Sequence, residues 1–360
     1  MSHKITSGAF TSGRKWMAGA GMAVALAATM TGCANTASTS GQAPQQVGDT
    51  AGQQVKIMVG GLNKQIYLPF KLADQLGYYK DAGLNIQLTD EPAGVDAETN
   101  MISGQVDGVG GFYDHNQVLQ AKGKSTEAVV TMLQVPGEVE LCRTDLKDKI
   151  KSAADWKGLN LGITDLGSST DYLTQYIGQK NGVAPTETHR IGVQAGATLI
   201  AAIDHKNIDC AMTTEPTVSQ LVNTNKAFIL YDSRTLAGAQ ETFGGAYPAT
   251  SLYMTTAYVD AHKDVVQKLA DAYVKTLKFI ADHTAAEITD KVPADYYAGV
   301  GKDAYIKALD AEKGIYSPTG LMPADGPKIV NDVLQTNPDV KGKTIDLAKT
   351  FTNEFVQAAK

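Results

Sequence analysis

The strongest constraint on the fold is a regular alternation of β-rich runs with helical stretches, which begins near Val55 and restarts near Val139. In the first half, strand-like runs are predicted at 55–60, 85–89, 108–111 and 128–132. After the restart they are predicted at 139–143, 159–164, 189–193, 209–213 and 227–231. Strands that alternate with helices form mostly parallel sheets with helices on both faces. The sequence therefore predicts an α/β fold with two such units.

Helical periodicity separates these strands and dominates the last hundred residues. Leu68, Leu72 and Leu76 recur at every fourth position, and further helices are predicted at 93–103, 116–121, 170–180 and 198–204. A return strand is predicted at 251–255, followed by an apolar helical stripe from Val265 to Ile280. With 360 residues, the chain is long enough for two compact units.

The N-terminus has the layout of a secretory signal. Lys4, Arg14 and Lys15 precede an apolar run at 16–28, which is too short and too rich in Ala and Gly for a membrane span. The segment from Met30 to Cys33 resembles a bacterial lipobox, and it predicts a signal peptide at 1–32 and lipidation of Cys33. The alternative is ordinary cleavage near residues 27–28, with a free thiol at position 33. Residues 33–54 are rich in Ser, Thr, Gly, Gln and Ala and are predicted to be a flexible tether.

Composition and motifs argue against several classes of function. The net charge of −6 becomes −9 when the three basic residues of the signal are removed, which disfavours a nucleic-acid-binding surface. Three cysteines are too few for a four-Cys zinc or iron–sulfur site. No HExxH or GxSxG motif occurs, and the run at 122–125 lacks the leading glycine of a phosphate loop. We therefore expect no catalytic residues, no metal and no cofactor.

An ordered set of motifs resembles the nitrate/sulfonate/taurine family of ABC-transporter substrate-binding proteins, which is related to thiamine-pyrimidine synthases. The matching segments are GYYKDAGLNI at 77–86, SGQVD at 103–107, SAADWKGLNLGI at 152–163, GSST at 167–170, IDCA at 208–211, EP at 215–216 and YVDAHKDVV at 258–266. Thr214 stands where the family often has Trp.

This resemblance implies a two-lobed, type II periplasmic-binding-protein-like fold. Lobe 1 would comprise 55–143 plus 250–360, lobe 2 would comprise 144–249, and a solute would bind between them. The implied function is a non-enzymatic, extracytoplasmic solute-binding component of an ABC importer for a sulfonate, taurine or nitrate. The alternatives are a thiamine pyrimidine precursor or an aromatic carboxylate as ligand. A synthase is disfavoured because the chain has an export signal and no Cys cluster.

The resemblance also implies partners and a location. The importer's permease, and through it the ATPase, would be the protein partners of a monomeric receptor. A lipid anchor would hold this receptor at the membrane, facing the periplasm or the cell surface. No nucleic-acid partner is expected.

Candidate ligand-binding residues follow the predicted strands, because ligands of open α/β sheets bind beyond the carboxyl ends of the strands. In lobe 1 these are Asn63, Gln65 and Tyr113, with a polar turn and a packed core Tyr as the alternatives. In lobe 2 they are Gly167, Ser168, Ser169, Thr170, Thr214 and Glu215. The hydroxyls and free N–H groups of 167–170 suit an anion, or they simply cap the helix. The Glu215 carboxylate would pair with a ligand amino group, or Glu215-Pro216 only ends the strand.

The two remaining cysteines are Cys142, in the first crossover, and Cys210, in a strand of the second lobe. In the fold that the resemblance implies, these strands can run side by side, so a disulfide is possible. Two separate buried thiols are the alternative.

Overall fold

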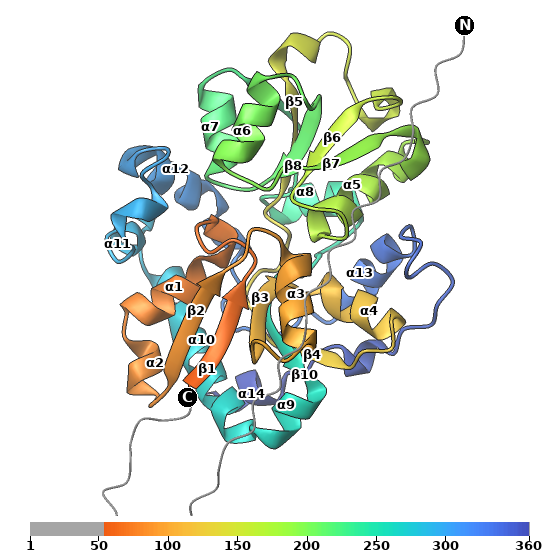
Figure 1. The fold of residues 1–360 in the computed structure, drawn as a ribbon. Helices are drawn as coiled ribbons and strands as arrows, with labels where there is room; N and C mark the ends of the chain where they lie inside the picture. The colour runs from red at the N-terminus through yellow and green to blue at the C-terminus, as the bar shows by residue number, and fades with distance from the viewer. Residues whose placement is uncertain (1–53, 360) are drawn as a thin grey trace, which may run out of the picture. The chain divides into compact units, whose positions relative to one another are not determined.

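The computed structural model describes residues 54–359 and is built on two five-stranded sheets (Figure 1). The first sheet has the order β2-β1-β3-β10-β4 and the second has the order β7-β6-β8-β5-β9. The strands of the first sheet are β1 Gln54–Val59, β2 Asn85–Asp90, β3 Gly108–Phe112, β4 Thr126–Thr131 and β10 Thr250–Thr255. Those of the second are β5 Val139–Arg143, β6 Asn160–Ile163, β7 His189–Gly192, β8 Cys210–Thr213 and β9 Ala227–Asp232.

Both sheets are mixed, and they share one topology. β1 pairs in parallel with β2 and β3, and β6 pairs in parallel with β7 and β8. The antiparallel strands are β10 and β5, each of which enters its sheet on a crossover from the other. The predicted α/β architecture of two helix-flanked sheets is confirmed, and we call the parts around the first and second sheets lobe 1 and lobe 2.

Helices flank both sheets. Their bounds are α1 Leu68–Gln75, α2 Tyr78–Asp81, α3 Gly94–Ile102, α4 Asp114–Ala121, α5 Ser169–Lys180, α6 Ala197–Asp204, α7 Thr217–Asn223, α8 Leu236–Phe243, α9 Thr256–Ala261, α10 Lys263–Asp282, α11 Ala285–Thr289, α12 Lys302–Glu312, α13 Gly326–Leu334 and α14 Glu354–Gln357. Helix α3 packs against β1, β3 and β10, and α5 packs against β6 and β8. Helix α13 contacts α4 of lobe 1 and α5 of lobe 2, so the C-terminal segment packs against both lobes.

The long helix α10 illustrates how the sequence pattern becomes packing. The predicted stripe runs from Val265 to Ile280. Its members Val266, Leu269, Tyr273, Leu277 and Ile280 are buried and Val265 is half-buried, while lysines and aspartates occupy the opposite face. Tyr273 of this stripe accepts a hydrogen bond at 2.9 Å from the hydroxyl of Tyr79 on α2. The stripe therefore belongs to the core of lobe 1.

Close packing explains the glycines of β3. A Cβ on Gly110 would lie 2.5 Å from the Phe70 ring on α1, and a Cβ on Gly111 would lie 2.9 Å from the Tyr253 ring on β10. Larger residues would push α1 and the neighbouring strand away from β3. The end of β3 is thereby held in position for the side chains that follow it.

The crossover strand β5 belongs to lobe 2. It pairs with β8 and β9, so the second sheet begins at Val139, five residues before the expected boundary at 143/144. The reason is that β5 makes its backbone hydrogen bonds to lobe 2 strands along its whole length. The first crossover therefore occupies 132–138, and the second occupies 244–249, close to the boundary expected at 249/250.

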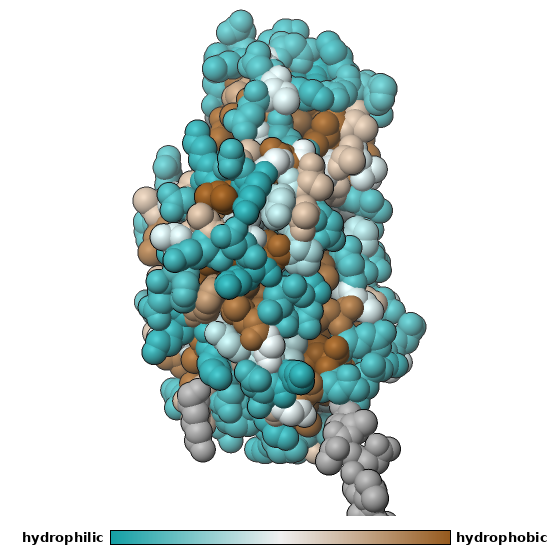
Figure 2. All heavy atoms as spheres, turned by 90° about the vertical axis from the view of Figure 1, so that its left-hand side faces the viewer, coloured by the Kyte–Doolittle hydropathy of each residue, from teal (hydrophilic) through white to brown (hydrophobic). Residues whose placement is uncertain are grey.

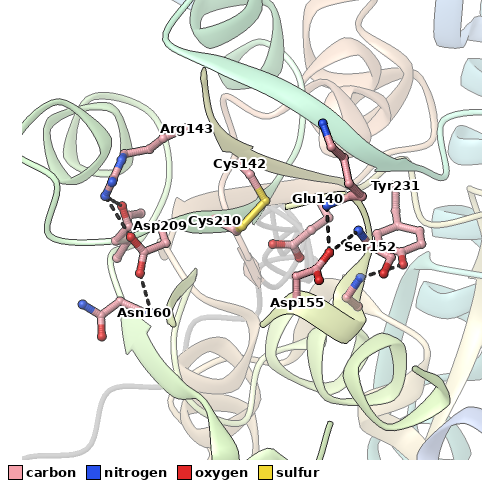
Figure 3. Close-up of a disulfide and its surroundings, with 12 residues drawn as sticks. Glu140, Cys142, Arg143, Ser152, Asp155, Asn160, Asp209, Cys210 and Tyr231 are labelled. Atoms are coloured by element: carbon pink, nitrogen blue, oxygen red, sulfur yellow. Dashed lines mark hydrogen bonds and ion pairs between the residues drawn. A yellow bond between two sulfur atoms is a disulfide. The ribbon is translucent and has the colours of Figure 1, made fainter. Parts of the chain in front are cut away.

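The structure joins Cys142 and Cys210 by a disulfide (Figure 3). The two residues are directly opposite each other in the β5–β8 pair, with Cα atoms 3.9 Å apart, and neither is exposed to solvent. Beside them, Arg143 Nη1 donates a 2.9 Å hydrogen bond to Asp209 Oδ1. A covalent bond and an ion pair thus both link the crossover strand to β8.

The predicted signal peptide, Cys33 and the tether up to residue 53 lie outside the described residues. Within 54–359, no helix has both the length and the apolar character needed to cross a membrane. The face drawn in Figure 2 is mostly hydrophilic, with apolar residues in small separate patches.

Candidate functional site

A small cavity lies between the two lobes, where the strands of both sheets end. Its volume is about 20 Å³, which is room for about one water-sized group. Lobe 1 contributes loops after β1 and β3, and lobe 2 contributes the ends of β6 and β8 and the start of α5. The lining residues are Gly60, Lys64, Ile66, Tyr67, Gly94, Phe112, His115, Glu138, Thr164, Ser168, Ser169, Thr170, Thr213 and Thr214.

Hydroxyl groups dominate the lobe 2 wall of this cavity. Ser168 is the N-cap residue of α5, and its buried Oγ has no hydrogen-bond partner within 54–359. The same holds for Thr213 Oγ1 at the end of β8. The Thr170 hydroxyl, in contrast, accepts from the Thr164 N–H at 3.0 Å and bonds to the Thr164 hydroxyl at 2.8 Å. A helix N-terminus with two available hydroxyls suits an anionic group.

Lys64 brings a cation to the same cavity from the loop after β1. Its Nζ donates to the carbonyl oxygens of Gly60 at 2.8 Å and Pro92 at 3.1 Å. The side chain as a whole is partly exposed, but burial of the ammonium lowers the Lys64 pKa to about 8, against the opposing effect of Glu138 and Asp90. An ammonium has three N–H donors, so one remains for a ligand.

Two buried carboxyl groups lie at the cavity: Glu138 lines it, and Asp114 lies behind the lining residue Ser169. Asp114 accepts hydrogen bonds from the Ser169 hydroxyl and the Tyr247 hydroxyl, both at 2.8 Å. The Ser169 bond joins lobe 1 to lobe 2. Glu138 lies in the first crossover with 5% of its surface exposed, and its Oε2 has no partner among the described residues.

His115 lines the cavity from lobe 1 and lies in a buried contact with Glu98. The His115 Nδ1 and Glu98 Oε2 atoms are 2.9 Å apart, an ion-pair distance without hydrogen-bond alignment. Burial lowers the pKa of His115, but Glu98 and Asp114 outweigh it and the net direction is upward. The ring also packs edge-on against Tyr172 of lobe 2, at a centroid distance of 6.0 Å.

The structure brings four of the predicted site residues to the cavity wall: Ser168, Ser169, Thr170 and Thr214. Gly167 lies next to them with φ +84°, and its N–H donates to the Asp171 carboxylate at 3.0 Å.

Asn63 lines a second, outer cavity of about 290 Å³. Lys64 lines both cavities. The outer cavity also has Asp90 and Asp295 on its wall, together with Gln194 of lobe 2 and the buried Tyr296.

Gln65, Tyr113 and Glu215 do not line either cavity. The Tyr113 hydroxyl bonds to Thr350 at 2.5 Å inside lobe 1, while its neighbour Phe112 faces the cavity. The Gln65 amide donates to the Tyr305 carbonyl, and its backbone N–H donates to the Glu215 carbonyl of lobe 2 at 3.1 Å. These residues therefore hold the walls together, and Tyr113 is the packed core residue of the alternative interpretation.

The Glu215 carboxylate already has a cationic partner, Arg234. Arg234 Nη1 donates to Glu215 Oε1 at 2.6 Å, and its Nη2 and Nε donate to the Asp232 carboxylate. Glu312 of α12 lies near this pair with both carboxyl oxygens unpartnered in the described part of the chain, and burial raises its pKa well above the usual value. An amino group of a ligand therefore has no free Glu215 carboxylate to meet.

Replacing Arg234 with Met is expected to lower the free energy of unfolding by about 3 kcal/mol, because a buried carboxylate would lose its cation. Glu215 is only 1% exposed. Urea unfolding monitored by circular dichroism measures the effect. The control is Lys206→Met, which breaks an exposed pair with Asp145 and should change stability by less than about 1 kcal/mol. Equal effects of the two substitutions would contradict the prediction.

Sequence reasoning did not select Lys64, His115 or Glu138. Lys64 and His115 follow the ends of predicted strands. The rule that ligands bind beyond the carboxyl ends of strands, here called the strand-end rule, could therefore have identified them. Glu138 precedes β5 in a crossover, where that rule gives no signal. Among the described residues, no group of three or more His, Cys, Asp or Glu side chains is placed to hold a metal ion.

Comparison with known proteins identifies the family. The profile of the NMT1/THI5-like family matches residues 65–286. The chain belongs to the NMT1/THI5-like family. A protein of known structure from Bordetella bronchiseptica RB50 is 34% identical to this member of the family, with a TM-score of 0.81 over 85% of this chain and 96% of that one.

More distant structures share the fold. The alkanesulfonate-binding protein SsuA from Xanthomonas axonopodis pv. citri, bound to MOPS, is 18% identical, with a TM-score of 0.66 and coverage of 83% of this chain and 98% of that one. The nitrate-binding protein NrtA from Synechocystis PCC 6803 is 14% identical, with a TM-score of 0.64 and coverage of 85% and 87%. The putative binding protein YtlA of Bacillus subtilis is 23% identical over 67% of this chain and 71% of its own length. The predicted resemblance to this group of substrate-binding proteins is confirmed.

Proposed function

We propose that this protein is the extracytoplasmic solute-binding component of an ABC importer and that it binds a small anion of the sulfonate, taurine or nitrate class. The observation that carries the proposal is the cavity between the lobes, where the start of α5 faces Lys64. The ABC permease, and through it the ATPase, would receive the solute. The chain would be held at the membrane through lipidated Cys33 and would act as a monomer.

The proposed mechanism depends on the fact that each lobe contributes one wall of the inner cavity, the small cavity between the lobes. An anionic group in the inner cavity would accept hydrogen bonds from Ser168 and Thr213 of lobe 2 and from Lys64 of lobe 1. Such a ligand favours the arrangement in which both lobes contact it, and the crossovers at 132–138 and 244–249 would absorb the motion that admits and releases it. The outer cavity would take the remainder of a larger solute.

A neutral or amino-bearing solute, such as a thiamine pyrimidine precursor, is the second candidate. The unpartnered oxygen of buried Glu138 favours it, because a carboxylate there would accept hydrogen bonds from an amino group. An aromatic carboxylate would fit the anionic alternative, with its ring in the outer cavity. The SsuA and NrtA proteins named above are an alkanesulfonate-binding and a nitrate-binding protein, which agrees with our proposal that this protein is not an enzyme.

Thermal unfolding of the mature chain with a panel of probes tests the function. Nitrate, taurine, isethionate, MOPS, benzoate and an aminopyrimidine cover the candidate classes. A probe present at 100 times its Kd should add about 2.7 kcal/mol to the free energy of unfolding. A panel in which no probe stabilises the protein would defeat the proposal.

Replacing Lys64 with Met is expected to weaken binding of the stabilising anion by about 10- to 100-fold, because one hydrogen bond from a charged donor is lost. Isothermal titration calorimetry measures the Kd. Lys71→Met is the matched control, since Lys71 lies on α1 and pairs only with Asp74 among the described acids. Unchanged affinity in the Lys64 variant would place the anion elsewhere.

A further inference from the structure

The two carboxyl groups near the inner cavity have opposite surroundings. Both oxygens of Asp114 accept a hydroxyl hydrogen bond, from Ser169 and from Tyr247. Glu138 is also buried, with 5% of its surface exposed against 0% for Asp114, yet its Oε2 has no donor within residues 54–359. Donors stabilise an ionised carboxylate, and burial without donors favours the neutral acid. When two such groups lie in one site, the proton resides on the one with fewer donors.

The charged groups around Glu138 reinforce this difference. Lys64 faces it from the loop after β1, Asp114 from α4, and Glu140 from the strand β5 that follows. The positive charge of the Lys64 ammonium favours an ionised Glu138, whereas the carboxyl groups of Asp114 and Glu140 disfavour it. Burial raises the pKa of Glu138 well above the usual value, and Asp114 and Glu140 raise it further against the effect of Lys64.

The backbone holds Glu138 rigidly at the cavity. Its carbonyl accepts hydrogen bonds from the Ser233 N–H at 3.0 Å and the Ser233 hydroxyl at 2.5 Å. The Ser233 carbonyl in turn accepts from the Gly137 N–H. Because these bonds fix the crossover at the end of β9, the Glu138 side chain stays on the cavity wall.

We propose that Glu138 is a specificity-determining residue that acts as a neutral carboxylic acid and donates a hydrogen bond to an oxygen of the bound anion. This inference rests on the proposed function. It gives the cavity a convergent set of donors: the Glu138 O–H, the hydroxyls of Ser168 and Thr213, and the remaining N–H of Lys64. A group with several oxygens on one centre, such as a sulfonate or nitrate, matches this set of donors. Because the cavity of about 20 Å³ holds only a water-sized group, such an anion would bind with the lobes further apart than in this structure. A buried Glu138 carboxylate would instead repel it.

Two sulfonates of nearly equal size distinguish a donating acid from an accepting carboxylate. Taurine carries an ammonium group where isethionate carries a hydroxyl. With a neutral Glu138, calorimetry at neutral pH should give both the same Kd within about 3-fold, whereas an accepting carboxylate should favour taurine by about 10-fold or more.

Variants at position 138 complete the test. Glu138→Gln retains an N–H donor and should bind within about 3-fold of the wild type, while Glu138→Ala loses the donor and should bind about 10-fold or more weakly. Glu241→Gln is the control, because Glu241 is an exposed carboxyl on α8 that does not line the cavity, and the affinity of this variant should be unchanged. A taurine preference that Glu138→Gln abolishes, or unchanged binding by Glu138→Ala, would overturn the proposal.

Infrared difference spectroscopy tests the protonation state without any ligand. The spectrum of the wild type minus Glu138→Gln at neutral pH should contain the C=O band of a protonated carboxyl group. If it contains only carboxylate bands, the inference fails whatever the protein binds. If the band is present but neither sulfonate binds, the proposed ligand class is wrong, and so is the assignment of Glu138 as a donor to a bound anion. The other probes of the thermal-unfolding panel then decide whether the protein binds a solute.

Discussion

Reduction of the Cys142–Cys210 disulfide is expected to lower the free energy of unfolding by about 4 kcal/mol, because the bond closes a long loop in the unfolded chain. The bonded residues are 68 positions apart, and the loop includes most of lobe 2. Figure 3 shows the bond between the two strands, and neither cysteine is exposed to solvent. The crossover strand β5 should separate from β8 more easily once the bond is broken.

Urea unfolding of the oxidised protein, the reduced protein and the Cys142→Ala/Cys210→Ala double variant measures this effect. The double variant controls for reductant, and it should resemble the reduced protein. Because the sulfurs are buried, reductant should act slowly on the folded protein and quickly in denaturant. Equal unfolding midpoints for oxidised and reduced protein would contradict the prediction.

As the pH rises from about 4.5 to about 8, Glu140 is expected to lower the free energy of unfolding of the wild type by about 5 kcal/mol. The Glu140→Gln variant should not show this decrease. Glu140 is 1% exposed, and its Oε1 has no partner in the described chain. The Thr174 hydroxyl donates to Oε2 at the long distance of 3.4 Å. Burial therefore raises the Glu140 pKa from 4.5 to about 8, with only a small opposing effect of Thr174.

The sign follows from proton linkage. A group whose pKa is higher in the folded state binds its proton more tightly there, so its stabilisation is complete below the unfolded pKa and disappears as the pH rises through the folded pKa. The difference in unfolding free energy between the wild type and Glu140→Gln, measured at pH 5 and pH 9, isolates this residue from Glu138. Glu241→Gln, an exposed substitution on α8, serves as the control. A difference that does not change with pH would contradict the prediction.

Local patterns were sufficient to predict the main elements of the two sheets. The helix predicted at 170–180 is α5, Ser169–Lys180, and the strand predicted at 189–193 is β7, His189–Gly192. Periodicity and turn residues act over a few positions, so they can be recognised without knowing the tertiary structure. The strand-end rule likewise placed Ser168, Ser169 and Thr214 at the cavity, because the ends of parallel strands meet at one edge of a sheet.

The sequence by itself therefore determined the alternating α/β architecture, the family and the hydroxyl-rich wall of lobe 2. The tertiary structure alone decided which side chains of lobe 1 face the cavity. Tyr113 bonds to Thr350, and the amide of Gln65 bonds to Tyr305, contacts that span more than two hundred residues. Because the C-terminal segment covers these polar groups, they turn away from the cavity. Its lobe 1 wall then includes Lys64, Phe112 and His115, with Glu138 of the crossover beside them.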